Sequence, residues 1–134
     1  MAEISRVKLY DYISYLNDGQ MLLLVDENIR GLKKVQKPAK VYLNNTNLLY
    51  AYCEECEIGT VRETFFANQV SARYLLKIAK QGDFVVSAKY TVEVGGKEKG
   101  FAQIKDMEES LVAADDIEVG KGSKVPLWLF GFLY

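Results

Sequence analysis

Residues 82–99 read Gly-Asp-Phe-Val-Val-Ser-Ala-Lys-Tyr-Thr-Val-Glu-Val-Gly-Gly-Lys-Glu-Lys. The apolar run Phe-Val-Val and the β-branched run Tyr-Thr-Val-Glu-Val are typical of two strands, and Ser-Ala-Lys between them is typical of a tight turn. Such a hairpin would bring Asp83 near Glu93, with Lys97 following on the same stretch. Because Mg²⁺ binds one or two carboxylates and keeps several waters, Asp83 and Glu93 are candidate metal ligands. The alternative is that these acids are solvated or form turns.

An acid at the start of one strand, followed by Glu-x-Lys on the next, resembles the PD-(D/E)xK motif of restriction-endonuclease-like nucleases. This chain departs from that motif, because Val-Gly-Gly separates Glu93 from Lys97 and places the lysine two positions late. A metal ion bound by such acids would polarise a phosphoryl oxygen or supply hydroxide.

The composition is that of an ordinary soluble domain. The chain has 134 residues, 49% hydrophobic and 26% charged, which fits one domain, or one domain plus a small appendage, with a real core. A net charge of −1 gives no general attraction to nucleic acid, so phosphate binding would need a local basic patch. There is no histidine, which excludes histidine-based triads and histidine-ligated zinc. With no signal peptide and no long apolar run, we expect a cytoplasmic protein that does not enter a membrane.

Two further motifs are incomplete. Cys53-Glu-Glu-Cys56 is one CxxC pair, which cannot complete a four-ligand zinc site within one chain. The surrounding sequence does not frame it as a thioredoxin-type motif, so we expect two reduced thiols. The Gly-Lys-Gly-Ser-Lys run at 120–124 does not match the phosphate-binding GxxxxGK[ST] string, so no ATPase activity is expected of this stretch of chain.

The first forty residues resemble the second half of a winged helix. A helix is predicted from Ser5, as N-cap, to Asn17, and a strand follows at 21–25. The segment 30–40 then holds five basic residues. It is either a wing that contacts phosphates or a solvated loop. Residues 1–40 are therefore predicted to be a partial winged-helix segment.

The rest of the chain predicts an α/β fold, a small mixed sheet with flanking helices. Thr60 and Glu63 have the spacing of a capping box, which would start a helix. The apolar tail 126–134 should be buried, against its own sheet or against another chain. The expected elements are strands at 41–43 and 111–114, helices at 48–52, 61–70 and 101–107, and either type at 73–79.

Four segments carry a more specific resemblance. They are 41–48, 59–66, 91–97 and 125–132. Together they resemble the C-terminal domain of a family of prokaryotic AAA-type ATPases. In that family a P-loop ATPase module precedes a winged-helix segment and a restriction-endonuclease-like domain of unassigned function. The resemblance extends from Ser5 to Tyr134. It implies a winged-helix part at 1–40, a nuclease-like domain at 41–134, and ATP binding only by a module that this stretch lacks.

The resemblance also implies roles for individual residues. Asp83 and Glu93 would hold Mg²⁺, and Lys97 would stabilise the phosphate in the transition state or orient water. Glu63 would assist through a second metal or a bound water. Gln103, on the helix expected after the second strand, would lie nearby.

Three functional hypotheses follow. The first is a nuclease-like module of an AAA-type ATPase that binds nucleic acid and cleaves it with a divalent metal. The second is a catalytically inactive interaction or regulatory domain. It would dock the ATPase module of the same full-length chain to a protein partner or to itself, as a homo-oligomer formed through the apolar C-terminus. The third is a DNA-binding winged helix. Cation-dependent cleavage separates the first hypothesis from the other two.

Overall fold

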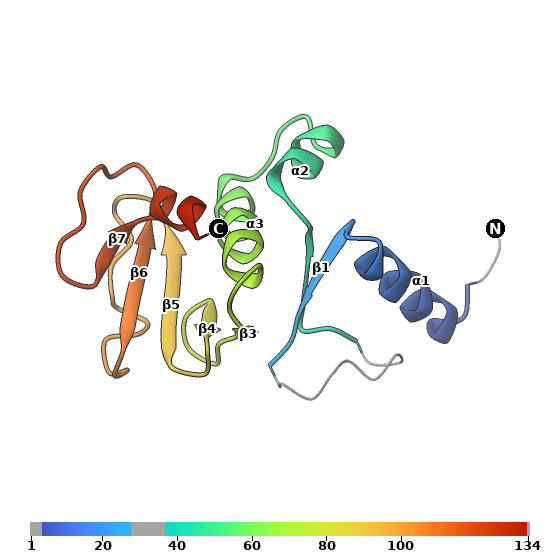
Figure 1. Ribbon diagram of the computed structural model, residues 1–134, viewed down its shortest axis with the longest axis horizontal. Helices are drawn as coiled ribbons and strands as arrows, with labels where there is room; N and C mark the ends of the chain where they lie inside the picture. The colour runs from blue at the N-terminus through green and yellow to red at the C-terminus, as the bar shows by residue number, and fades with distance from the viewer. Residues whose placement is uncertain (1–3, 28–36, 134) are drawn as a thin grey trace.

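The computed structural model describes residues 4–27 and 37–133. Within this part the elements are α1 (Arg6–Asp18), β1 (Leu22–Val25), β2 (Lys40–Leu43), α2 (Thr46–Tyr52), α3 (Ile58–Ser71), β3 (Leu76–Ile78), β4 (Phe84–Val86), β5 (Tyr90–Gly95), β6 (Ser110–Ala114), β7 (Lys124–Pro126) and a 3-10 helix, η1 (Leu127–Phe132). The described strands form a five-stranded sheet, ordered β3-β4-β5-β6-β7, and a separate β1-β2 pair. α3 lies between the two sheets (Figure 1). The predicted α/β class with a mixed sheet is confirmed.

The hairpin predicted from residues 82–99 is confirmed as β4 and β5. The two strands are antiparallel, with Phe84 opposite Val92. Ser87 and Ala88 form the turn with φ of 53° and 56°. β3 adds to β4 in antiparallel fashion, whereas β6 pairs with β5 in parallel and β7 with β6 in parallel. The segment 73–79, which the sequence left open, therefore contains a strand.

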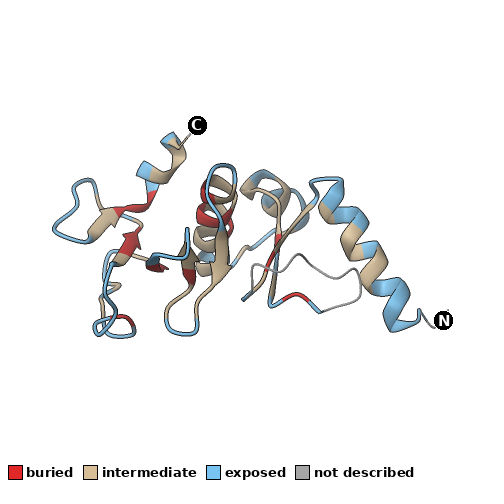
Figure 2. Cartoon of the chain, turned by 60° about the horizontal axis from the view of Figure 1, so that its bottom comes forward, coloured by how far each residue is buried: buried red, intermediate tan, exposed pale blue. Residues whose placement is uncertain are grey.

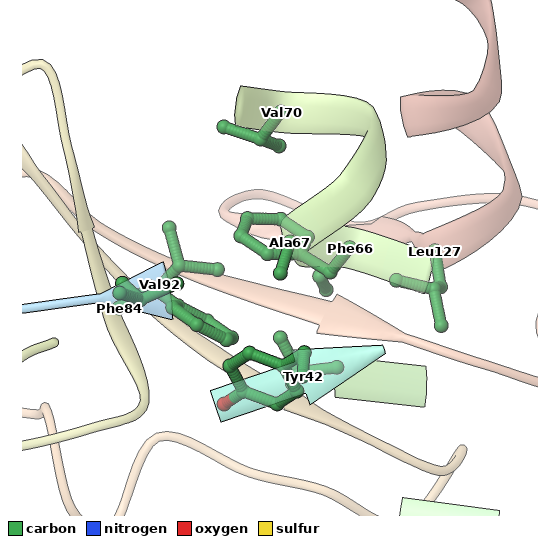
Figure 3. Packing of buried hydrophobic residues seen from close by; sticks show 10 residues of the cluster. Tyr42, Phe66, Ala67, Val70, Phe84, Val92 and Leu127 are labelled. Carbon is green, nitrogen blue, oxygen red and sulfur yellow. The ribbon is translucent and has the colours of Figure 1, made fainter. Parts of the chain in front are cut away.

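Most of the core lies between α3 and the large sheet. Figure 3 shows Phe66 and Ala67 of α3 beside Phe84 of β4, and Figure 2 shows buried segments concentrated in this region. The small sheet joins the same core, because its residues Val25 and Tyr42 are buried in the same cluster. Residue 40 is the predicted boundary between the two parts of the chain, and strands from both parts thus contribute to one core.

α1 begins as predicted but buries none of its residues. The Ser5 side chain accepts a hydrogen bond from the Lys8 backbone N–H, as an N-cap does. The helix lies at the end of the molecule away from α3 (Figure 1). The winged-helix assignment stays a prediction. Most of the basic segment, residues 30–36 with Arg30, Lys33 and Lys34, lies outside the described residues.

The capping box predicted at Thr60 and Glu63 is wrong. α3 begins earlier, at Ile58, and its N-cap is Glu57. The Glu57 carboxylate accepts from the Thr60 backbone N–H at 3.1 Å and from its hydroxyl at 2.8 Å. Glu63 is therefore not used to cap the helix, and its side chain is available for contacts elsewhere.

The helix predicted at 101–107 is also wrong. The segment forms successive turns, in which the backbone N–H of Ile104 donates to Phe101 and that of Met107 donates to Ile104. Ile104 is nevertheless completely buried, in a second small cluster with Val112 and Ala114 of β6. The turns carry the chain from β5 to the parallel β6 with Ile104 pointing inward, as its apolar character predicts.

Within this chain the apolar tail is only partly buried, and the other predicted alternative, burial against another chain, stays a prediction. Leu127 is 4% exposed, but Trp128 is 50% exposed and Phe132 is 63% exposed. A 3-10 helix has three residues per turn, so a short one presents a single row of side chains to its neighbour. In η1 that row includes Phe130, whose ring meets Phe66 of α3 edge to face at 4.8 Å.

The turn before β4 requires a glycine, and this gives a first prediction. Gly82 has a φ of 85°, and a Cβ there would lie 2.8 Å from Ile104 Cγ2. We expect Gly82→Ala to lower the free energy of unfolding by about 2–4 kcal/mol, measured by urea denaturation. Gly100→Ala is the control, because a Cβ there meets nothing within 4 Å. A Gly82 variant as stable as the Gly100 variant would contradict the packing described here.

Candidate functional site

Three of the four predicted site residues converge. Glu63 comes from α3, Asp83 stands directly before β4, and Glu93 lies within β5. The pKa of the Asp83 carboxyl is raised, chiefly by burial, and further by the negative charges of Glu93 and Glu63. The backbone N–H of Val94, which donates to Asp83 Oδ2 at 2.8 Å, opposes this shift. Helix and hairpin thus bring three carboxylates close enough to influence one another electrostatically.

Glu93 is the most deeply buried of the three acids. Its side chain is 1% exposed, and its Oε1 lies 2.5 Å from Lys99 Nζ. In the amide orientation that satisfies both groups, the Gln103 side chain donates to Glu93 Oε1 at 3.0 Å and to Oε2 at 3.3 Å. A buried carboxylate requires such partners, because burying an unpaired charge is very costly. Gln103 therefore lies near the acids, as predicted, although it stands in a turn.

Glu63 is held by two residues of β2. Lys40 Nζ lies 2.9 Å and the Tyr42 hydroxyl 2.6 Å from the same oxygen, Glu63 Oε2. Burial first, and then the Glu63 carboxylate, raise the pKa of Tyr42. Its hydroxyl therefore stays protonated and donates a hydrogen bond to Glu63. The Lys40 ammonium group also lies 5.8 Å from the centre of the Phe84 ring. The small sheet thus contributes a lysine and a tyrosine to the site.

Lys97 lies apart from this group. Its side chain is exposed, and its carbonyl oxygen accepts a hydrogen bond from Lys124. The lysine that reaches Glu93 is Lys99 instead. The chain turns back at this point, with the Lys99 backbone N–H donating to the Gly96 carbonyl at 2.9 Å.

Sequence reasoning missed Lys99, Lys40 and Tyr42 as members of the site. The signal for Lys99 was the Gly95-Gly96 pair, since two glycines allow a turn that returns a later side chain to the strand. The signal for Tyr42 was its alternation in a short strand, which predicts an inward side chain. Its hydrogen-bond partner, Glu63, lies 21 positions later, so no local sequence pattern connects the two residues.

The site offers carboxylate oxygens, which are the ligand type that hard divalent cations take. Three carboxylates face two ammonium groups, so the cluster carries one negative charge in excess. In the described part of the chain, no group of three or more histidine, cysteine, aspartate or glutamate side chains has the geometry to hold a metal ion. Asp83 and Glu93 offer two carboxylates, which is the number that Mg²⁺ accepts while keeping its waters.

The two cysteines lie outside this site. Cys53 and Cys56 are free thiols, as predicted. The Cys56 thiol donates to the carbonyl oxygens of Leu49 and Cys53, at the end of α2. Burial and the neighbouring Cys53 raise the pKa of Cys56 to about 11. At neutral pH this thiol is therefore protonated and a weak nucleophile.

Comparison of the chain with protein-family models, with curated proteins and with solved structures finds no match. Within residues 4–27 and 37–133, no helix is long and apolar enough to cross a membrane.

Proposed function

We propose that this chain is a nuclease-like module that binds the phosphate backbone of a nucleic acid and cleaves it with Mg²⁺. The observation that supports it is the convergence of Glu63, Asp83 and Glu93 with Lys99 beside them. One acid comes from a helix and two from the following hairpin, as the resemblance to the C-terminal domain of AAA-type ATPases implies. Under this proposal the fold of residues 41–134 is restriction-endonuclease-like, and an ATPase module of the same full-length chain is the natural partner.

Each residue has a role that its contacts support. Asp83 and Glu93 would hold the metal, which would polarise a phosphoryl oxygen or supply hydroxide. Lys99 would donate to a non-bridging phosphate oxygen, where negative charge builds up in the transition state. Lys40, whose side chain is 38% exposed, can contact a neighbouring phosphate from the rim of the site. Tyr42 would keep the Glu63 carboxylate in place.

The charge of the site makes nucleic-acid binding depend on a cation. Without one, the cluster has an excess negative charge and repels phosphate. With one divalent cation the same cluster becomes positive by one charge. Since the whole chain carries only −1, this local change decides whether a phosphate backbone is attracted.

The test separates binding from cleavage. Labelled single-stranded and double-stranded DNA and RNA are incubated with the chain in millimolar Mg²⁺, Mn²⁺ or Ca²⁺, or in EDTA. We expect cleavage with Mg²⁺ or Mn²⁺, retention without cleavage in Ca²⁺, and neither in EDTA. Absence of both cleavage and cation-dependent retention would remove the nuclease proposal.

A second prediction concerns Lys40. Replacing it by methionine should weaken nucleic-acid retention about three- to tenfold and reduce the slope of log affinity against log salt by about one. Fluorescence anisotropy in Ca²⁺ measures both quantities. The matched control is Lys8→Met on α1, an exposed lysine at the other end of the molecule. A loss confined to the Lys8 variant would favour binding through the predicted winged helix instead.

A different observation supports the interaction-domain alternative. Large apolar side chains are exposed together around a hollow of about 270 Å³ between α2, α3 and η1, among them Tyr50 at 59% and Trp128 at 50%. A soluble chain exposes such a patch when it binds a protein surface. Light scattering would then show a dimer that Trp128→Ser converts to a monomer, or a complex with the ATPase module. Cleavage would be absent.

A further inference from the structure

Lys99 holds the position at Glu93 that a metal would need. Its ammonium group lies 2.5 Å from Glu93 Oε1, and that carboxylate is 1% exposed. The carboxylates of Glu93, Asp83 and Glu63 all raise the pKa of Lys99. Lys99 is thus the cation paired with Glu93 and is influenced by the other two acids, whereas Lys40 is the cation paired with Glu63.

Gly95 provides the space in which Lys99 lies. A Cβ on Gly95 would come within 2.6 Å of Lys99 Cγ and 2.8 Å of Lys99 Cβ and Cδ. The alkyl chain of Lys99 therefore lies directly over the backbone two residues after Glu93. Any side chain at Gly95 would push it away. The absence of a side chain at Gly95 and the turn back at Gly96 act together to deliver the ammonium group to Glu93.

We propose that Lys99 is a tethered counter-ion that occupies the cation position at Glu93 in the metal-free protein and moves to the substrate phosphate when a divalent cation binds. The inference rests on the proposed metal-dependent function. Lys99 and the divalent cation are then mutually exclusive at Glu93 Oε1. Competition with its own lysine weakens metal binding, and the displaced ammonium group becomes available for phosphate. Its side chain is 34% exposed, so it can swing outward without crossing the core.

Calorimetric titration with Mn²⁺ tests the exclusion directly. We expect Lys99→Met to bind Mn²⁺ about tenfold tighter than the natural chain, because loss of a charge-assisted contact at Glu93 removes the competitor. Lys97→Met is the matched control. It removes the same charge from an exposed neighbour and should change the affinity by less than about twofold. If the natural chain binds Mn²⁺ and the Lys99→Met variant binds it with the same or a weaker affinity, the inference is overturned and the proposed function stands.

A second variant guards against misfolding of Lys99→Met, which leaves Glu93 without its partner. Gly95→Ala keeps every charge but displaces the Lys99 side chain, so it too should bind Mn²⁺ more tightly. Thermal melts in EDTA and in Mn²⁺ should show a larger rise in Tm for both variants than for the natural chain. If none of the three chains binds Mn²⁺ at millimolar concentration, the inference and the metal-dependent function both fail.

Discussion

Replacing Asp83 by asparagine is expected to lower the rate of Mn²⁺-dependent cleavage by about a hundred- to a thousandfold. The change removes one of the two carboxylates proposed to hold the metal and keeps the shape of the side chain. The amide oxygen of asparagine can still accept the hydrogen bond that Val94 N–H donates to Asp83 at 2.8 Å. The rate is measured on a labelled nucleic acid at saturating Mn²⁺. Asp115→Asn, which changes a partly exposed acid paired with Arg62, is the matched control.

The same substitution is expected to stabilise the metal-free protein at neutral pH, by about 0.5–2 kcal/mol. Asp83 is partly buried beside Glu93 and Glu63, and these effects raise the pKa of its carboxyl above the ordinary value. A carboxyl with a raised pKa destabilises the folded state when it is ionised. Removing that charge relieves the repulsion. A residue with only a structural role would instead lose stability on substitution, so urea denaturation in EDTA distinguishes the two cases.

The raised pKa of Asp83 determines how the free energy of unfolding changes with pH. As the pH falls through the raised folded pKa of Asp83, the carboxyl takes up a proton in the folded state first, and the natural chain gains stability. The asparagine variant has no such gain. The difference in unfolding free energy between the two chains should therefore shrink between neutral pH and the ordinary pKa of aspartate. A difference that grows with acid would contradict the raised pKa.

Local patterns were enough to predict most elements of this fold. Alternating and β-branched runs located β4 and β5, and Ser5 located the start of α1, because these signals act within a few residues. The errors lie where two local rules compete or where packing decides. Glu57 and Thr60 both offer caps near the start of α3, and the helix uses the earlier one. In 101–107, burial of Ile104 is satisfied by turns, so an apolar pattern alone could not distinguish them from a helix.

The candidate site could be predicted only as far as its acids. Asp83 and Glu93 are neighbours through a hairpin, and hairpins are visible in sequence. The contacts to Glu63 come from β2, 21 and 23 positions earlier, and depend on how the small sheet meets α3. The choice of Lys99 over Lys97 depends on a turn and on the bare backbone of Gly95. The spacing of a known motif cannot reveal that Lys99 takes the place expected of Lys97, because Lys99 reaches the site by a turn of the backbone and not by its position along the strand.

The other large expected effect is on the core that holds these elements together. Phe66→Ala should lower the free energy of unfolding by about 3–5 kcal/mol, measured by urea denaturation. Phe66 is completely buried, its ring stacks on Phe84 at a centroid distance of 5.3 Å, and Phe130 meets it edge to face at 4.8 Å. Alanine would leave a cavity between α3, β4 and η1, which cannot collapse without moving all three elements (Figure 3).

This core substitution also bears on the site, because Phe66 joins the two elements that carry Glu63 and Asp83. A shift of α3 relative to β4 would move Glu63, which would assist through a second metal or a bound water, away from Asp83, so Mn²⁺ affinity should fall in parallel with stability. Tyr52→Ala is the control, since Tyr52 is 72% exposed and its loss should change stability by less than about 0.5 kcal/mol. If Phe66→Ala unfolds the chain more easily yet leaves Mn²⁺ affinity unchanged in the folded fraction, the site is held by the hairpin alone and Glu63 is not part of it.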